Sequence, residues 1–147
     1  MSELINDVNR RATLVINTDG GSRGNPGPSA IGVVITTPDG QHLESFGKYL
    51  GEGTNNFAEY SGVIAGLEAA AKYQPKTIQF LLDSELVVKQ LNGQYRVKHP
   101  DLQPLYHQVK ALAEPYDVSF QHVLRGKNHL ADTEVNKALD EAAHSAA

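Results

Sequence analysis

The sequence predicts an α/β domain built on a mixed sheet of antiparallel and parallel strands. Residues 14–18, 30–36 and 42–50 form three apolar segments separated by glycine-rich turns, which is typical of antiparallel strands. Helix and strand patterns follow in the order helix, strand, helix, helix, strand, helix, which favours parallel pairing. The 147 residues are enough for one domain with a substantial core.

The first strand is predicted over Leu14–Thr18, an apolar and β-branched run that stops at Asp19. The turn DGGSRGNPGP follows and leads into a second strand, Ala30–Thr36, so the two strands form a hairpin. An Asp-Gly pair favours a turn by itself, but a two-residue loop needs far fewer turn residues. We interpret the glycines, which lack Cβ atoms, as places where a ligand's backbone comes close (Gly20, Gly21, Gly24 and Gly27).

The remaining elements follow from changes in hydrophobic period. His42–Leu50 is less apolar and is expected at an edge of the sheet. Gly62 and Gly66 weaken the first long helix, so their presence indicates close packing against the sheet. The later elements are a helix over 56–73, a strand over 77–82, helices over 84–91 and 101–113, a strand over 118–124 and a helix over 128–143.

Two regions are expected, a flexible leader over residues 1–11 and a single domain over 12–145. The chain has no cysteine, hence no disulfide and no thiolate metal site, which fits a cytoplasmic location. No run approaches the roughly 20 apolar residues of a membrane span. The first residues lack the apolar core of a secretory signal, so we expect no membrane partner.

The net charge of -4 argues against a protein that grips nucleic acid by bulk positive charge. It does not exclude a protein whose acids gather in one site and are neutralised by cations. Four acids stand at positions that suit such a site. Asp19 and Asp83 directly follow predicted strands, and Glu59 and Asp132 lie in the first turns of predicted helices.

Each acid also has a purely structural interpretation. Glu59 could form a capping box with Asn56, Asp83 could cap the next helix, and Asp132 could favour the helix dipole. Their joint placement favours a site, because open α/β sheets put their sites at the carboxyl ends of strands. Four carboxylates at one edge would repel each other unless divalent cations neutralised them, as in two-metal phosphoryl-transfer sites.

Four motifs carry a family resemblance: TDGGSRGNPGP, TNNFAEY, LLDSELVVKQLNG and RGKNHLADTEVNKALD. They contain the four acids and span about residues 13–140, and the chain closely resembles the type 1 ribonuclease H family on them. The resemblance implies the ribonuclease H fold, a five-stranded mixed sheet with helices on both faces. It also implies a catalytic domain that hydrolyses the RNA strand of RNA–DNA hybrids with two Mg²⁺, or Mn²⁺ in their place, and leaves 5′-phosphate and 3′-hydroxyl ends.

The same resemblance implies a role for each acid. Asp19 would bridge both ions, and Asp132 would help to hold the ion that activates the attacking water. Glu59 and Asp83 would hold the ion that stabilises the leaving oxygen. We expect a monomer without a small-molecule cofactor. The residues expected to face the hybrid are Gly20, Gly21, Ser22, Arg23, Asn25, Thr54, Asn55 and Asn56.

The chain also departs from the family pattern. Many members carry a histidine in a longer loop before the last helix, but here the loop is Arg125–Asn128, so Arg125 or Lys127 is a candidate for contacting phosphate instead. We expect His122 to be a partly buried structural residue and His129 to be solvated. The lysine-rich helical protrusion of some members is absent. Glu134 stands in an ordinarily apolar slot, so either the last helix turns slightly or Glu134 reaches solvent beside the metals.

Two other functions stay open. A ribonuclease H-like module could bind hybrid or duplex RNA without catalysis, although the presence of all four acids argues against this. A structure-selective DNA nuclease, such as a junction resolvase, could use the same fold. The TNN motif and the DGGSRGNPGP turn fit hybrid cleavage better.

Overall fold

The computed structural model describes residues 12–146, so the predicted leader at 1–11 lies outside the described residues. A five-stranded sheet has the order β3-β2-β1-β4-β5. β1 pairs antiparallel with β2 and β2 with β3, whereas β1–β4 and β4–β5 are parallel. The predicted mixed sheet is confirmed, as is the edge position of the third strand. The strands are β1 (Thr13–Ser22), β2 (Gly27–Thr36), β3 (His42–Gly53), β4 (Thr77–Leu82) and β5 (Asp117–His122).

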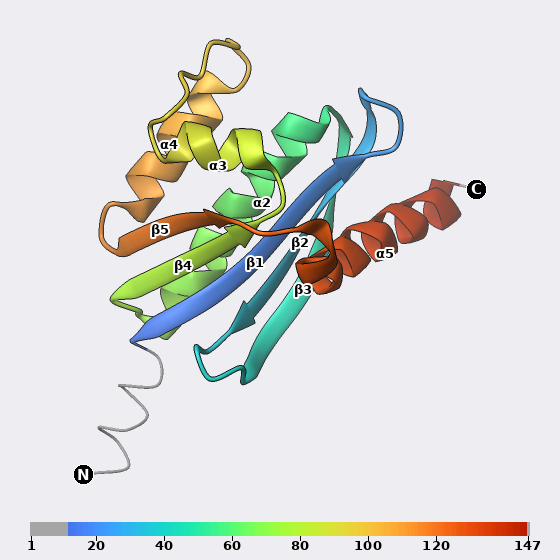
Figure 1. Cartoon of the computed structure of the whole chain (residues 1–147). Helices are drawn as coiled ribbons and strands as arrows, with labels where there is room; N and C mark the ends of the chain where they lie inside the picture. The colour runs from blue at the N-terminus through green and yellow to red at the C-terminus, as the bar shows by residue number, and fades with distance from the viewer. Residues whose placement is uncertain (1–11, 147) are drawn as a thin grey trace.

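Helices cover both faces of the sheet, as predicted (Figure 1). α2 (Asn55–Ala70) covers one face together with α3 (Glu85–Leu91) and α4 (Gln103–Ala113), and α5 (His129–Ala146) covers the other. Short 3₁₀ turns, η1 (Ala71–Tyr73) and η2 (Arg125–Lys127), follow α2 and precede α5. Among the described residues, none of the helices combines the length and the apolar character needed to cross a membrane.

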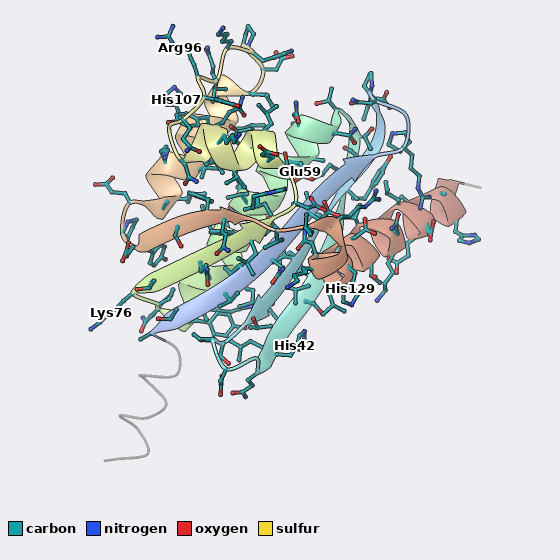
Figure 2. All side chains as sticks on the ribbon, in the orientation of Figure 1. His42, Glu59, Lys76, Arg96, His107 and His129 are labelled. Carbon is teal, nitrogen blue, oxygen red and sulfur yellow. The ribbon has the colours of Figure 1, made fainter. Side chains whose placement is uncertain are left out.

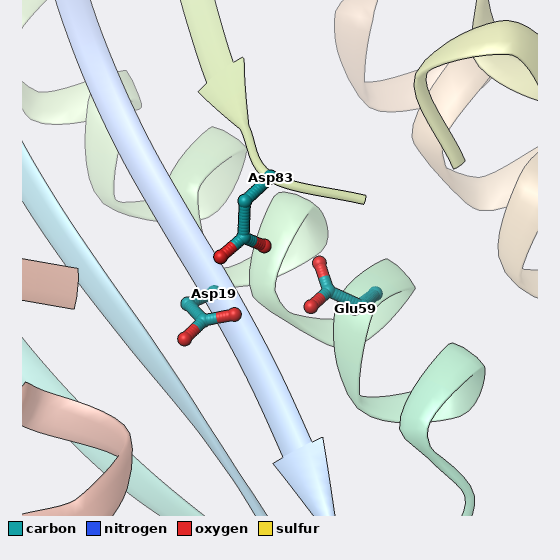
Figure 3. A group of neighbouring side chains, drawn as sticks. All are labelled: Asp19, Glu59 and Asp83. Carbon is teal, nitrogen blue, oxygen red and sulfur yellow. The ribbon is translucent and has the colours of Figure 1, made fainter. Parts of the chain in front are cut away.

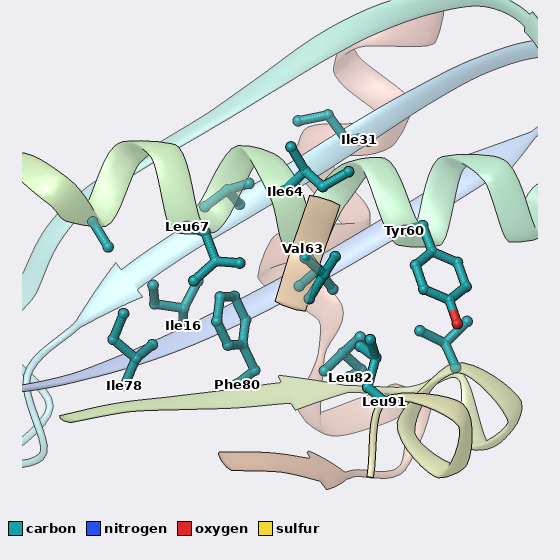
Figure 4. Packing of buried hydrophobic residues seen from close by; sticks show 14 of the residues in the cluster. Ile16, Ile31, Tyr60, Val63, Ile64, Leu67, Ile78, Phe80, Leu82 and Leu91 are labelled. Carbon is teal, nitrogen blue, oxygen red and sulfur yellow. The ribbon is translucent and has the colours of Figure 1, made fainter. Parts of the chain in front are cut away.

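The main core lies between α2 and the sheet (Figure 4). Val63 and Leu67 of α2 pack with Ile16 of β1 and Phe80 of β4, and all four are almost completely buried. A smaller apolar cluster joins α5 to β2 through Ala30, Val135, Ala138 and Leu139. The two faces of the sheet therefore pack against different helices.

The first strand is longer than predicted. β1 continues through the glycines to Ser22, because residues 19–22 pair with residues 29–32 of β2. Its parallel pairing with β4 stops at Asn17 and Leu81, so Asp19 lies just beyond the point where β1 and β4 separate. The prediction that Asp19 ends a strand is wrong, but the sheet does open beside it.

Other bounds differ by a few residues. The helix predicted to Tyr73 ends at Ala70 and continues as η1, α4 begins at Gln103, and α5 runs on to Ala146. The last strand ends at His122 rather than at Leu124. His122 is exposed, which corrects the expectation of partial burial, because it is the last residue of an edge strand.

Glycines permit direct contact between helix and strand backbones. A Cβ at Gly20 would lie 2.2 Å from the carbonyl carbon of Ala58 in α2. A Cβ at Gly32, the β2 partner of Asp19, would lie 2.1 Å from the carbonyl oxygen of Ala131 in α5. These two contacts place the residues that follow in each helix, Glu59 and Asp132, beside Asp19.

At two positions of the turn the fold itself requires a glycine, and the predicted approach of a ligand's backbone stays a prediction there. Gly20 is required by α2, and Gly27 by its own turn, where a Cβ would lie 2.1 Å from the carbonyl oxygen of Arg23. The expectation for the α2 glycines is confirmed. A Cβ at Gly62 would lie 3.0 Å from the carbonyl oxygen of Asp19, and one at Gly66 would lie 2.9 Å from the Phe80 ring.

Gly20→Ala should destabilise the protein by about 2 kcal/mol or more, because the added methyl group forces two backbones apart. Gly21→Ala is the matched control, since its Cβ would meet only Val135 Cγ1, at 3.6 Å. Urea unfolding of both variants measures the difference. Equal free energies of unfolding for the two variants would contradict the close contact at Gly20.

Candidate active site

Three carboxylates converge where β1 and β4 separate (Figure 3). Asp19 comes from β1, Glu59 from α2, and Asp83 directly follows β4. One carboxylate oxygen from each lies within 4.8 Å of the others. Asp132, in the first turn of α5, is not part of this tight group but lines the same cleft of about 450 Å³. The structure thus brings the four predicted acids to one cleft.

Glu59 is fixed by the backbone of β1. The Gly20 amide donates to Asp19 Oδ1 at 2.9 Å and to Glu59 Oε1 at 3.3 Å, so a single N–H is shared by two carboxylates. Glu59 is 7% exposed, and its Oε2 accepts no hydrogen bond from any described residue. A buried oxygen without a partner is costly in a folded protein, and a cation bound at this point would satisfy it.

The capping interpretations of these acids are not supported. Thr54 caps α2, because its hydroxyl oxygen accepts a hydrogen bond from the Phe57 amide at 3.1 Å. Ser84 caps α3 by accepting from the Val87 amide at 3.3 Å. Glu59 and Asp83 are therefore not needed as caps and remain directed into the cleft.

The cluster holds like charges in a poorly solvated place. Burial, together with the negative charge of Asp83, raises the pKa of Asp19 to about 7. Burial also raises the pKa of Glu59, and the charge of Asp19 adds to that rise. The pKa of Asp83 is raised by burial as well, against the opposing effects of a hydrogen bond from Asn128 and the charge of Arg125. Ionising the whole cluster near neutral pH calls for added positive charge.

The donor set fits hard divalent cations. Its members are carboxylate oxygens, the ligands that Mg²⁺ and Mn²⁺ prefer. The unpartnered Oε2 of Glu59 supplies a free lone pair at the same point. These residues could therefore hold one or more divalent ions.

The residues predicted to face the hybrid border two adjoining hollows. Asn55 and Asn56 line both, and hydrogen bonds tie the glycine turn to this start of α2. Asn55 Oδ1 accepts from the Ser22 amide at 2.9 Å, and the Asn55 amide donates to Asn25 Oδ1 at 3.0 Å. Asn25 and Thr54 line the second hollow, of about 810 Å³. The acid-lined cleft also includes Gly20, Gly21, Ser22, Arg23 and Arg125.

Two charged residues of α5, Asp140 and Glu134, form ion pairs away from the acids. Asp140 holds Arg23 in an exposed ion pair, with 2.7 Å between Arg23 Nη2 and Asp140 Oδ1. The Cβ of Glu134 lies against the Gly32 position, and its carboxylate lies 3.6 Å from Lys137 Nζ. Glu134 does not line the acid-lined cleft, so it does not reach solvent beside the carboxylates.

No histidine is found among the described residues that line the acid-lined cleft. His42, His107 and His129 all lie apart from Glu59 (Figure 2). His129 is exposed at the start of α5, as predicted. Arg125, in η2, lines the cleft and is exposed.

Asn128 is a residue of the site that the sequence reasoning missed. It is 1% exposed, and its Nδ2 donates to the backbone oxygen of Thr18 at 2.9 Å. Its Oδ1 accepts from Asn17 Nδ2 at 3.0 Å. The only signal in the sequence was its position at the start of a predicted helix. An asparagine at that position is also a common helix cap, so the signal did not indicate a role in the site.

A family model and several known proteins match most of this chain. The model of the family described as "Reverse transcriptase-like" matches residues 17–138. The bifunctional protein Rv2228c of Mycobacterium tuberculosis is 47% identical over 136 residues, covering 91% of this chain and 37% of that protein. Ribonuclease HI of Halobacterium salinarum is 44% identical over 125 residues, covering 84% of this chain and 63% of that protein. The chain thus spans less than two thirds of the length of these relatives.

Solved structures resemble the whole domain. The N-terminal RNase H domain of Rv2228c superposes with a TM-score of 0.88 at 46% identity, covering 92% of this chain and 99% of that one. LC11-RNase H1, solved in complex with an RNA/DNA hybrid, superposes with a TM-score of 0.85 at 41% identity, covering 88% and 98% of the two chains.

The raised pKa of Asp19 predicts a pH dependence of stability in the metal-free protein. A carboxyl with a folded pKa of about 7 and an ordinary unfolded value of 3.8 binds its proton more tightly when folded. Its stabilising contribution is complete below about pH 4 and is lost as pH rises to about 7. Thermal unfolding in EDTA should show a melting temperature that falls less between pH 5 and 7 in Asp19→Asn than in the wild type. Parallel profiles for the two proteins would contradict the assigned shift.

Proposed function

The chain belongs to the type 1 ribonuclease H family, and from this premise we propose that it is a metal-dependent endonuclease that hydrolyses the RNA strand of RNA–DNA hybrids. The observation that carries the proposal is the group of carboxylates of Asp19, Glu59 and Asp83, with Asp132 in the same cleft. The hybrid complex of LC11-RNase H1, a relative over nearly the whole domain, supports hybrid as the substrate. The expected products carry 5′-phosphate and 3′-hydroxyl ends.

The four acids would hold two Mg²⁺ ions, or Mn²⁺ in their place. Asp19 would be shared, because the other three carboxylates all lie near enough to affect its pKa. When bound, the ions supply an activated water and neutralise the charge that develops on the reacting phosphate. The chain's own contribution is to place four carboxylates around one point before substrate arrives.

The polar borders of the two hollows would receive the duplex. Backbone and side-chain groups of residues 20–25 and 54–56 lie on one side of the acids, joined by the hydrogen bonds at Asn55. Apart from Arg23, which is paired with Asp140, these groups are neutral. Neutral polar groups suit an RNA-containing duplex, whose wide, shallow minor groove displays 2′-hydroxyls and is recognised by shape. Arg125 lies beside Asp83 in the same cleft and would contact phosphate.

A strand-specific cleavage assay tests this function against its alternatives. A labelled 12-base-pair hybrid, a DNA duplex, an RNA duplex and a four-way DNA junction are each incubated with Mg²⁺, and with EDTA as control. We expect cleavage of the RNA strand of the hybrid and an intact DNA strand. Binding without cleavage would indicate a binding module, and cleavage of the DNA substrates would indicate a DNA nuclease.

Asp19→Asn should lower the cleavage rate by at least ~10³, because it removes a full charge from the carboxylate that both ions would share. Hybrid binding in Ca²⁺ should persist, and the melting temperature should hold or rise, since the substitution relieves repulsion in the cluster. Single-turnover rates and hybrid affinity measure the two effects separately. A variant that keeps a tenth of the wild-type rate would remove Asp19 from the centre of the mechanism.

Arg125→Ala should lower the steady-state rate more than the single-turnover rate. A guanidinium cannot accept a proton near neutral pH, so Arg125 would act by charge on the scissile or departing phosphate. Arg125→Lys should restore part of the rate. Lys127→Ala is the control, because it removes the same charge from the same turn but does not line the cleft. Equal steady-state rates for Arg125→Ala and wild type at saturating hybrid would make Arg125 a solvated loop residue.

A further inference from the structure

Asn128 lies at the junction of the elements that carry the acids. It is 1% exposed and stands between η2 and α5, so its side chain is directed inward under β1. A buried amide needs partners for both its donor and its acceptor, and Asn128 has them. Its Nδ2 donates to the Thr18 carbonyl at 2.9 Å, and its Oδ1 accepts from Asn17 Nδ2 at 3.0 Å.

The contacts of Asn128 involve three of the four acids, either directly or through the backbone next to them. Thr18 directly precedes Asp19, so the bond to its carbonyl holds the backbone from which Asp19 projects. The Asn128 side chain also lies near enough to the Asp83 carboxylate to oppose the rise of its pKa. The backbone oxygen of Asn128 accepts from the Asp132 amide at 3.1 Å, which begins the first turn of α5.

The carboxylates need a residue that keeps them in place, because their negative charges repel each other. Without cations, nothing in their own charges favours convergence, and Glu59 is the member tied to β1 by the Gly20 amide. Asp83 stands after the end of β4, where ladder bonds to β1 have already stopped. Asp83 is therefore not fixed to β1 by backbone pairing. The buried amide group of Asn128, which lies between Asp83 and β1, restricts its position instead.

We propose that Asn128 is a positioning residue that fixes Asp19, Asp83 and Asp132 relative to one another, and that it thereby sets the affinity of the site for divalent cations. The inference rests on the proposed metal-dependent function. Asn17 acts with it, since the bond from Asn17 Nδ2 leaves the amide of Asn128 in the orientation that directs its donor to Thr18. Groups that orient ligand residues typically change metal affinity 10–100-fold when removed.

The test measures Mn²⁺ affinity of the chain without substrate, by isothermal titration calorimetry, in the wild type, Asn128→Ala, Asn17→Ala and the double variant. We expect Asn128→Ala to weaken Mn²⁺ binding at least about tenfold. Asn17→Ala alone should weaken it about threefold, and the double variant should bind no more weakly than Asn128→Ala. Non-additivity of this kind is expected when two residues act through one bonded unit.

Tyr60→Phe is the matched control, because it breaks another buried side-chain hydrogen bond, from Tyr60 Oη to Gln90 Oε1 at 2.7 Å, outside the acid-lined cleft. It should lower the melting temperature without changing Mn²⁺ affinity more than twofold. Mn²⁺ affinity of Asn128→Ala within twofold of wild type would overturn the inference.

Two further outcomes complete the test. If Asn128→Ala does not fold, an unchanged Mn²⁺ affinity of Asn17→Ala would overturn the inference by itself. Failure of the wild type to bind Mn²⁺ would instead reject the proposed metal-dependent function, so the two failures are distinguishable.

Discussion

Two contacts between bare backbones hold the helices where the site needs them. At Gly20 the strand β1 lies directly against the Ala58 peptide of α2, and at Gly32 the strand β2 lies against the Ala131 carbonyl of α5. Any side chain at either glycine would occupy the same space as the helix backbone. Because Glu59 and Asp132 are the next residues in their helices, both acids arrive beside Asp19 from opposite faces of one sheet.

This arrangement concentrates negative charge where water is scarce. Asp19 and Glu59 are each 7% exposed, and burial raises the pKa of both carboxyls. A fold selected only for stability would not bury like charges together, whereas sites that bind cations commonly do. The net charge of the chain is -4, and it is consistent with acids that cations neutralise locally.

Much of the fold could be predicted from the sequence because its patterns are local. Alternation and period identified the strands and helices, and glycine inside α2 correctly indicated close packing. The ends of strands were harder to predict. β1 runs through Gly20 and Gly21, although glycine is depleted in strands. The pairing of these glycines with β2 extends the strand. The exposure of His122 likewise depends on its place at the end of an edge strand.

The site was predictable to the extent that its acids stand at element ends. The meeting of Asp19, Glu59, Asp83 and Asp132 in one cleft follows from sheet topology, which the order of strands and helices indicates. Individual side-chain bonds between distant segments were not predictable. The bond from Asn128 to the Thr18 carbonyl and the pair between Arg23 and Asp140 each join residues more than a hundred positions apart. Nothing local in the sequence marks such partners.

Anomalous scattering from Mn²⁺ tests the central claim, that these carboxylates converge in order to hold two ions against a hybrid. Crystals of the Asp132→Asn chain, which keeps an oxygen ligand while cleavage slows, would be grown with Mn²⁺ and a short RNA–DNA hybrid. We expect two anomalous peaks, both in contact with Asp19 and flanking one phosphate of the RNA strand. A single peak, or peaks that do not contact Asp19, would contradict it.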